Sequence, residues 1–190
     1  MFDYFGVLIS VIMGLALIHL LRGAVRLIQM RHEVHPYWVQ IVWTINCAFY
    51  VLGIWWGMFW WRDLQDWTVG WFYFIATYAI ALFLWAAMLY PVEYSRGFDF
   101  EKFFFDNRRW FFGIQTLVSL MDIPETLQKA ALHLRPVPAQ YVILAPTMVA
   151  LSLTGLLTRN RHVHAVLCVA WFTLLVGYLF LTPIARIFKG

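Results

Sequence analysis

Leu15-Ala-Leu-Ile-His-Leu-Leu-Arg-Gly-Ala-Val-Arg-Leu-Ile-Gln29 is the stretch that decides the fold class, because it places charged and polar side chains inside an apolar segment. Its polar residues recur at steps of three, four and three, which puts them on one helical face: His19, Arg22, Arg26 and Gln29. A helix in lipid cannot expose that face to hydrocarbon. The face must therefore look into the protein, into a watery cavity or out at the membrane surface.

The composition indicates an integral membrane protein. The 190 residues are 63% hydrophobic and 13% charged, and the mean hydropathy is +0.70. The longest polar interval, residues 91–109, is only about one span long, so no soluble catalytic domain is expected. The sequence contains no Gly-rich phosphate loop of the Walker type, which argues against an ATP-driven mechanism within this chain. The net charge of +4 comes from bases at span ends, so we expect no nucleic-acid partner.

Periodicity and length predict an all-α fold: a compact bundle of about six transmembrane helices in a single domain, residues 1–190. The expected full spans are residues 4–28, 37–61, 67–90, 139–158 and the stretch from His164 to about residue 187. Residues 110–134 are less regular, because their uninterrupted apolar run ends at Met121 after about 12 residues. We expect this helix to be either a full span or a short, re-entrant one.

Residues 91–109 alternate acids and bases among phenylalanines, which is typical of a segment that lies in the membrane interface. The phenylalanines are Phe98, Phe100, Phe103, Phe104 and Phe105. Lys and Arg are more frequent at Arg31, in this segment and at Arg159 and Arg161 than at the other turns. This bias predicts that these three turns face the cytoplasm and that both termini face outside.

A second polar stripe lies in residues 110–134, at steps of four, three, four and three: Gln115, Ser119, Asp122, Thr126 and Lys129, with Glu125 one position to the side. Taking Arg31 and Arg109 as the boundary, Arg22 lies about 13 Å deep and Asp122 about 20 Å deep. A lone charge at such depth costs at least about 2.5–3.5 kcal/mol. We therefore predict that Arg22 pairs with Asp122 near mid-membrane.

The candidate site for an ion or polar solute is an intramembrane cluster of His19, Arg22, Asn46, Asp122 and Glu125. His19 is its proton-active member, because imidazole titrates near neutral pH. Each polar residue also has a structural interpretation. Asp122-Ile-Pro-Glu125 is a helix N-terminus pattern that would end the membrane segment at Met121. Asn46 suits a helix-to-helix hydrogen bond, and Arg26 suits a snorkelling position at the interface.

No cofactor or metal is predicted. The histidines of the basic turns are expected to be solvated: His32, His35, His162 and His164. Haem between helices would need two deep histidines, and only His19 is deep. Cys47 and Cys168 are expected to be buried thiols without a pairing motif. An intramembrane enzyme ranks last, because no nucleophile-and-base or metal motif is present.

Three stretches carry a resemblance to a known group of proteins: His19-Leu-Leu-Arg-Gly-Ala-Val-Arg-Leu-Ile-Gln29, Tyr37-Trp-Val-Gln-Ile-Val-Trp43 and Arg108-Arg-Trp-Phe-Phe-Gly113. Together with most of the chain, they resemble small bacterial multispanning membrane proteins. The resemblance implies a location in the bacterial inner membrane, and it implies no activity.

The expected function is that of a channel or secondary transporter for a small ion, a proton or a polar solute, which uses the His/Arg/Asp cluster. The alternative is a non-transporting accessory or sensing subunit in which the cluster only holds helices together. Besides membrane lipids and the solute, we expect a second copy of the chain as partner. Ser10-x-x-x-Gly14 offers a surface for close helix approach in such a homo-oligomer.

Overall fold

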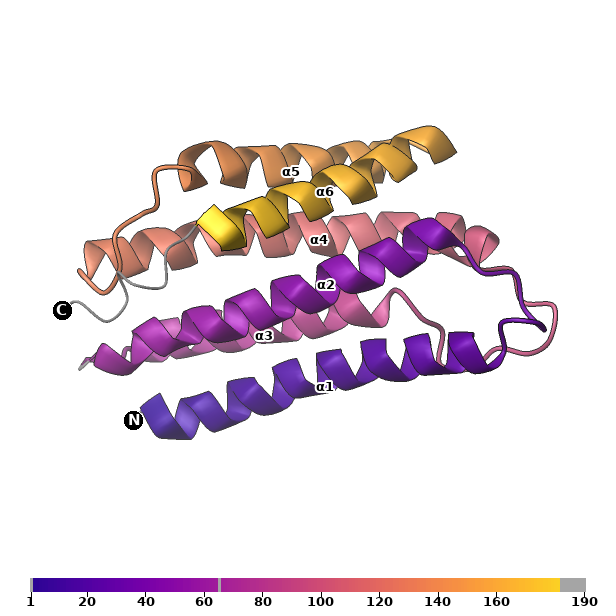
Figure 1. Cartoon of the computed structure of the whole chain (residues 1–190). Helices are drawn as coiled ribbons and strands as arrows, with labels where there is room; N and C mark the ends of the chain where they lie inside the picture. The colour runs from indigo at the N-terminus through magenta and orange to yellow at the C-terminus, as the bar shows by residue number, and fades with distance from the viewer. Residues whose placement is uncertain (1, 65, 182–190) are drawn as a thin grey trace.

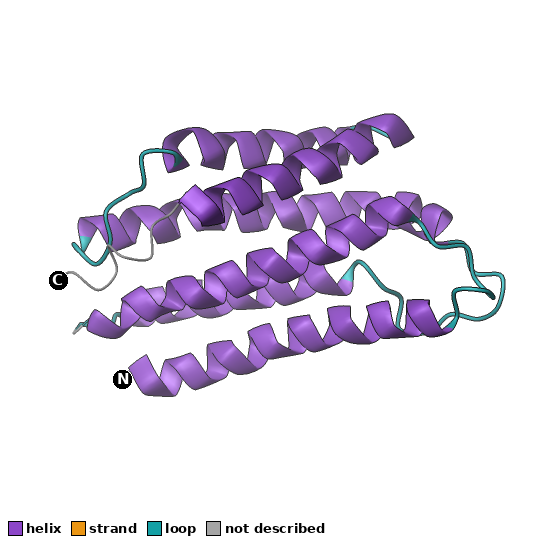
Figure 2. Ribbon diagram, in the orientation of Figure 1, coloured by secondary structure: helices purple, strands orange, loops and turns teal. Residues whose placement is uncertain are grey.

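A computed structural model describes residues 2–64 and 66–181, and this part of the chain consists of helices and loops (Figures 1 and 2). The helices are α1 (Phe2–Gln29), α2 (Trp38–Gly57), the short 3-10 helix η1 (Met58–Asp63), α3 (Val69–Ala87), α4 (Phe100–Ala131), α5 (Tyr141–Leu157) and α6 (Arg161–Leu181). Each α-helix runs antiparallel to the one before it (Figure 1). The prediction of an all-α bundle is confirmed.

The helices form a bundle in which α1 and α5 lie at opposite edges (Figure 1). Helix α1 packs on α3 and α2, and α5 packs on α4 and α6. The inner helices are joined by contacts of α2 with α6 and of α3 with α4. Helix α4 is therefore covered by α3 on one side and by α5 on the other.

Within the described part of the chain, four helices are long and apolar enough to cross a membrane: Tyr4–Gln29, Trp38–Asp63, Val69–Ala87 and Arg161–Phe180. Helix α5 has 17 residues and falls just short of that length. Helix α4 has 32 residues, about 48 Å, which exceeds a hydrocarbon core of about 30 Å. Helix α4 is not among these four helices because its composition is too polar. A bundle of six spans thus remains a prediction that depends on α4 and α5.

Helix α4 runs without interruption through Asp122 and Pro124. The interpretation of Asp122 as the N-cap of a separate helix is therefore wrong. The N-cap is Asp99, whose carboxylate accepts a hydrogen bond from the Lys102 backbone N–H at 3.0 Å, with Glu101 favourably placed in the first turn. Residues 100–109 consequently belong to the start of α4 rather than to a separate segment. The interfacial position of residues 91–109 stays a prediction.

The three turns that were expected on one side of the membrane do lie together at one end of the bundle (Figure 1). The His35 backbone N–H donates to the Phe98 carbonyl at 2.9 Å, and the Phe100 N–H donates to the His35 carbonyl at 3.1 Å. Across the same end, Arg108 Nε donates to the Thr158 carbonyl at 2.9 Å, and Arg161 pairs with Glu101. The side of the membrane that this end faces remains a prediction.

Buried aromatic rings from four helices fill the middle of the bundle. We call them the aromatic core: Trp43, Trp85, Phe111, Phe112 and Trp171. The ring centroids of Trp43 lie 5.3 Å from Phe111, 5.4 Å from Phe112 and 5.8 Å from Trp171. These contacts join α2, α4 and α6 into one packed unit, because aromatic pairs at such distances attract each other beyond their buried area.

One prediction concerns the close approach of α5 to this core. A Cβ on Gly155 would overlap the ring of Phe112, which is fully buried and cannot swing away. We expect Gly155→Ala to lower the free energy of unfolding by about 1–3 kcal/mol, the usual cost of overpacking. The measurement is thermal or denaturant unfolding in detergent. Gly177→Ala on α6 is the matched control, because no atom lies within 4 Å of its added Cβ. Equal stability of the two variants would contradict the packing of α5 on Phe112.

Candidate functional site

The polar face of α4 points into the bundle. Gln115, Ser119, Glu125 and Lys129 are buried, and Asp122 and Thr126 line a cavity. The sequence-predicted stripe is therefore confirmed as one inward face. A face of this polarity is stable between helices only when its groups find partners there.

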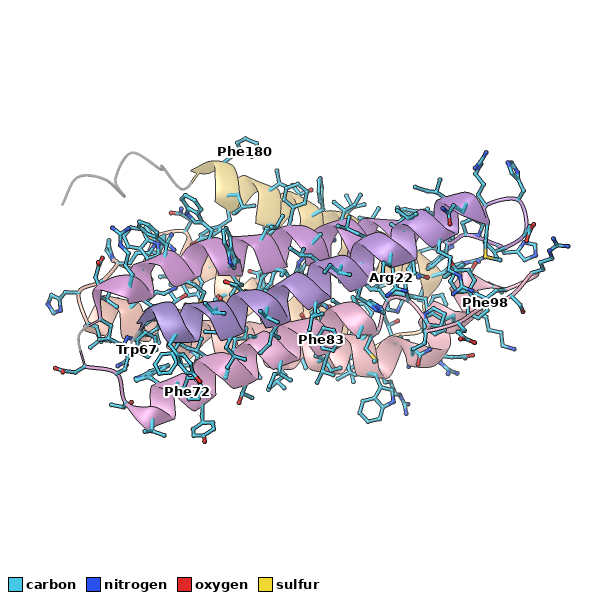
Figure 3. All side chains as sticks on the ribbon, turned by 90° about the horizontal axis from the view of Figure 1, so that it is seen from below. Arg22, Trp67, Phe72, Phe83, Phe98 and Phe180 are labelled. Carbon is cyan, nitrogen blue, oxygen red and sulfur yellow. The ribbon has the colours of Figure 1, made fainter. Side chains whose placement is uncertain are left out.

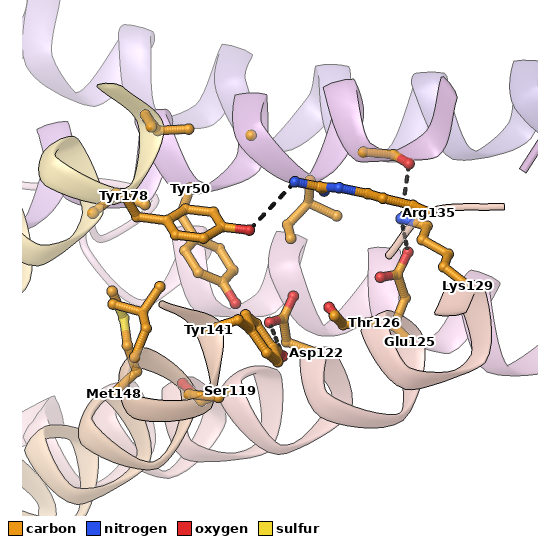
Figure 4. Close-up of a pocket in the computed structure, with 17 residues that line it drawn as sticks. Tyr50, Ser119, Asp122, Glu125, Thr126, Lys129, Arg135, Tyr141, Met148 and Tyr178 are labelled. Atoms are coloured by element: carbon orange, nitrogen blue, oxygen red, sulfur yellow. Dashed lines mark hydrogen bonds and ion pairs between the residues drawn. The ribbon is translucent and has the colours of Figure 1, made fainter. Parts of the chain in front are cut away.

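The cavity has a volume of about 100 Å³ and lies between α2, α4, α5 and α6, towards the end of the bundle that holds residues 132–140 (Figures 1 and 4). Its polar side chains come from separate parts of the chain: Tyr50, Ser119, Asp122, Glu125, Thr126, Lys129, Arg135, Tyr141 and Tyr178. Leu144, Met148 and Leu175 are among its apolar walls. The volume suffices for several water molecules or for one small solute.

The Asp122 carboxylate is held by tyrosine hydroxyls. Tyr141 donates to Oδ2 at 2.6 Å (Figure 4). Tyr78 donates to Oδ1 at 3.1 Å, so the carboxylate links α4 to α5 and α3. The Tyr50 hydroxyl lies 3.4 Å from that of Tyr78 and extends the chain to α2. Within residues 2–64 and 66–181, Asp122 forms no ion pair with a basic side chain. Its charge is therefore stabilised by hydroxyl donors and is open to a cationic ligand or a proton.

Glu125 and Lys129 form a buried ion pair one turn apart on α4, with Nζ 2.5 Å from Oε1. Their exposed fractions are only 3% and 4%. Trp61 Nε1 donates to the same Glu125 oxygen at 2.9 Å. Lys129 Nζ donates to the Gly57 carbonyl at 2.8 Å (Figure 4). Gly57 lies at the junction where α2 passes directly into η1. Lys129 thus ties α4 to the backbone at this junction.

Arg135, in the loop after α4, brings a second cation to the cavity. Its guanidinium donates to the Tyr178 hydroxyl at 3.5 Å (Figure 4). The guanidinium also lies 5.6 Å from the centre of the Trp60 ring. Arg135 forms no ion pair with a carboxylate in the described part of the chain. The cavity therefore contains an acid and a base that are not paired with each other.

Two neighbours of the cavity on α4 have buried polar atoms without hydrogen-bond partners in the described structure. These atoms are both amide atoms of Gln115 and the hydroxyl oxygen of Ser119. A buried polar group without a partner costs about 1–3 kcal/mol, so such groups require an explanation. They lie along the face that leads from Asp122 towards the aromatic core, and they extend the polar surface beyond the cavity.

The predicted pairing of Arg22 with Asp122 is wrong. Arg22 and His19 line a different hollow, on α1, while Asp122 is bonded to tyrosines. The depth of Asp122 was counted from Arg109, but α4 begins at Phe100, so Asp122 lies about 33 Å along its helix. Arg22 lies only about 10 Å from the end of α1 at the same end of the bundle.

The structure therefore divides the predicted cluster. Asp122 and Glu125 meet in the cavity, and His19 and Arg22 lie together elsewhere. Asn46 joins neither group, because its Nδ2 donates to the Cys168 carbonyl at 2.9 Å and so ties α2 to α6. That contact agrees with the structural interpretation of Asn46.

Two further expectations can be compared with the structure. His164 was expected in solvent but is fully buried, with its ring 5.2 Å from that of Phe112 and its Nε2 3.1 Å from the Thr158 carbonyl. Cys47 and Cys168 are buried free thiols, as predicted. Among the described residues, no group of three or more His, Cys, Asp or Glu side chains could hold a metal ion.

The tyrosines and Arg135 are site residues that sequence reasoning missed. Tyr50 and Tyr78 are phenols inside apolar spans, and the need of a buried hydroxyl for a partner is a signal that could have selected them. Arg135 lies in a loop, where no periodicity indicates the direction of a side chain.

The buried pair generates a prediction about stability. Lys129→Met should lower the free energy of unfolding by about 3–5 kcal/mol, because it strands the Glu125 carboxylate. The double variant with Glu125→Gln should be more stable than this single variant, since no buried charge is left. The measurement is unfolding in mixed detergent and SDS micelles. Glu101→Gln, which breaks the exposed pair with Arg161, is the control and should cost at most about 1 kcal/mol. A loss from Lys129→Met no larger than that of the control would contradict burial of the pair.

No protein-family model, curated protein or solved structure matches this chain. The resemblance to small bacterial multispanning proteins accordingly remains a prediction. The geometry of the cavity is what supports a function.

Proposed function

We propose that this membrane protein is a channel or secondary transporter that accepts a small ion, a proton or a polar solute in the cavity at Asp122. The observation that carries the proposal is the Asp122 carboxylate itself. It lines a cavity of about 100 Å³ and has tyrosine hydroxyls, but no described basic side chain, as partners. An ionisable residue kept inside a helical bundle is the usual mark of an ion or solute path.

Two neighbours give the site its polarity. Arg135 provides a positive charge on the same cavity wall, so that a ligand with separated charges can contact a base and an acid at once. The tyrosine chain from Asp122 through Tyr78 to Tyr50 provides hydroxyls, which both donate and accept and can therefore pass a proton.

The aromatic core closes the path beyond Ser119 in this conformation. Trp43, Phe111 and Phe112 are packed ring against ring, and each is at most 2% exposed. A solute that enters at Arg135 would stop at Asp122 until these rings repack. Such a one-sided site favours a gated path or alternating access over a permanently open pore.

The rival proposal is an accessory or sensing subunit, and one observation favours it. Glu125 pairs with Lys129 and accepts from Trp61, and Lys129 also donates to the Gly57 carbonyl. These bonds act as a structural lock between α2, η1 and α4. In that role the charges hold helices together and no solute crosses.

We include in the proposal a bacterial inner-membrane location and a homo-oligomer. Ser10 Oγ accepts a hydrogen bond from Trp55 Nε1 of α2 at 3.2 Å, so this part of the predicted surface is used within the chain. No described atom lies within 4 Å of a Cβ added at Gly14, so the Gly14 part remains accessible to a second copy.

Flux through purified protein in liposomes tests the proposal. Proton entry is followed with an entrapped pH dye under a potassium diffusion potential, Na⁺ entry with an entrapped indicator, and glycerol entry by stopped-flow light scattering. We expect at least one of the three probes to move faster than in empty liposomes. Asp122→Asn should slow that probe about tenfold or more, the effect of losing one hydrogen bond to a charged group, about 1.5–3 kcal/mol.

Asp106→Asn is the matched control, because Asp106 is an exposed aspartate on the same helix and lies outside the cavity. It should leave flux unchanged. Folded wild-type protein that moves none of the three probes would contradict transport and favour the accessory subunit. Flux that is equally fast in Asp122→Asn and Asp106→Asn would contradict the assigned site.

A further inference from the structure

Helix α1 continues to Gln29, whereas its neighbour α3 ends at Ala87. The chain after α3 continues alongside the C-terminal half of α1 in the same direction, with Tyr90 at Gly23 and Tyr94 at Arg26. An open groove of about 820 Å³ lies between this segment and α1. Figure 3 places Arg22 on this part of α1, towards the end of the bundle where Phe98 lies. The groove is separate from the Asp122 cavity, with which it shares no lining residue.

The groove is positively charged. His19, Arg22 and Arg26 line it, and no Asp or Glu does. Arg22 is exposed, and its guanidinium makes no hydrogen bond or ion pair with another residue of the described chain. A cation in that position, next to lipid, is stable when an anion accompanies it.

Arg26 is held in place at the edge of the groove. It donates to the Tyr94 carbonyl at 2.7 Å and to the Val92 carbonyl at 3.4 Å, and its guanidinium lies 4.2 Å from the centre of the Tyr94 ring. These bonds use two of its five N–H donors, so others remain for a ligand. Two buried polar atoms of the groove lining have no hydrogen-bond partner among the described residues: the Tyr94 hydroxyl oxygen and His19 Nε2.

Apolar side chains adjoin the charged part of the groove. Leu15, Ile18, Leu21 and Val25 line the groove and are exposed. Arg22 lies about 10 Å from the end of α1, a depth that an arginine and a lipid phosphate can share when the side chain extends towards the headgroups. The surface thus offers cations for a phosphate and an apolar wall for acyl chains.

We propose that this groove binds an anionic phospholipid, with its phosphate between Arg22 and Arg26 and its acyl chains along the exposed face of α1. Arginine guanidinium groups are well matched to phosphate oxygens, because several N–H donors can bond at once. The absence of acids from the groove lining favours an anionic over a zwitterionic headgroup, since nothing in the lining would pair with an added positive charge. The bound lipid would also cover the part of α1 that α3 leaves open.

Lipid titration of the purified full-length protein in detergent, followed by native mass spectrometry, tests the proposal. We expect dioleoyl phosphatidylglycerol to bind more tightly than dioleoyl phosphatidylcholine. Arg22→Gln should weaken phosphatidylglycerol binding about fivefold, the effect of about 1 kcal/mol for one arginine at an anionic lipid. Arg22 makes no bonds within the described fold, so thermal unfolding of the lipid-free variant should match the wild type.

Arg109→Gln is the matched control. Arg109 is an exposed arginine on α4, about 13 Å from the start of its helix, and it lies outside the groove. Equal weakening by the two substitutions would show a general attraction of basic residues and overturn the site. Equal binding of the two lipids, or full displacement of phosphatidylglycerol by inorganic phosphate, would also overturn it. The flux variants at Asp122 do not touch this groove, so the two proposals can fail separately.

Discussion

The buried ion pair between Glu125 and Lys129 is the interaction on which the arrangement of the helices depends. A helix with so polar a face cannot lie against lipid, because each unpaired charge would cost several kcal/mol. Within the bundle, Lys129 pairs with Glu125 and donates a hydrogen bond to the Gly57 carbonyl, and Trp61 donates a hydrogen bond to Glu125. The neighbouring helices then cover α4 on both sides, and Asp122 is brought to the wall of a cavity.

Two polar stripes of similar spacing, on α1 and α4, lie in different environments in this protein. The stripe on α4 contains both signs of charge, so it can be neutralised within the bundle and faces inwards. The stripe on α1 contains only bases and an amide, and its four residues line an open groove near the end of the helix. Internal neutralisation decides which stripe is buried, since an all-positive face has to find its anions outside the chain.

The sequence was sufficient for the helical class, for the inward face of α4 and for the grouping of three turns at one end. The first two follow from local periodicity, and the third follows from the order of the helices and the distribution of Lys and Arg among the turns. The sequence also contains a signal for the start of α4, because Asp99 and Glu101 make a helix N-terminus pattern. A second such pattern, at Asp122 to Glu125, competes with it. Because the start of the helix was placed at about residue 110, the expected depth of Asp122 was too small, and the predicted pairing with Arg22 was incorrect.

Other features of the site could not be derived from spacing. The partners of Asp122 come from α3 and α5, and the second cation comes from a loop, so each depends on which helices pack together. His164 is another such residue, because its position next to a basic turn indicates solvent whereas packing against Phe104 and Phe112 buries it. Tertiary contacts decide these positions, and a single sequence does not specify them.

Accessibility of single cysteines along α4 tests the central claim most directly, that α4 is one continuous helix whose polar face lines a cavity inside the bundle. The variants are made in protein without Cys47 and Cys168 and treated with a small, membrane-impermeant thiol reagent. Cysteines at Ser119, Asp122 and Thr126 should react from the side that holds residues 132–140. Cysteines at the outward positions Leu117, Leu120 and Leu127 should be protected by lipid. Reaction at all six positions, or at the outward set alone, would contradict the account.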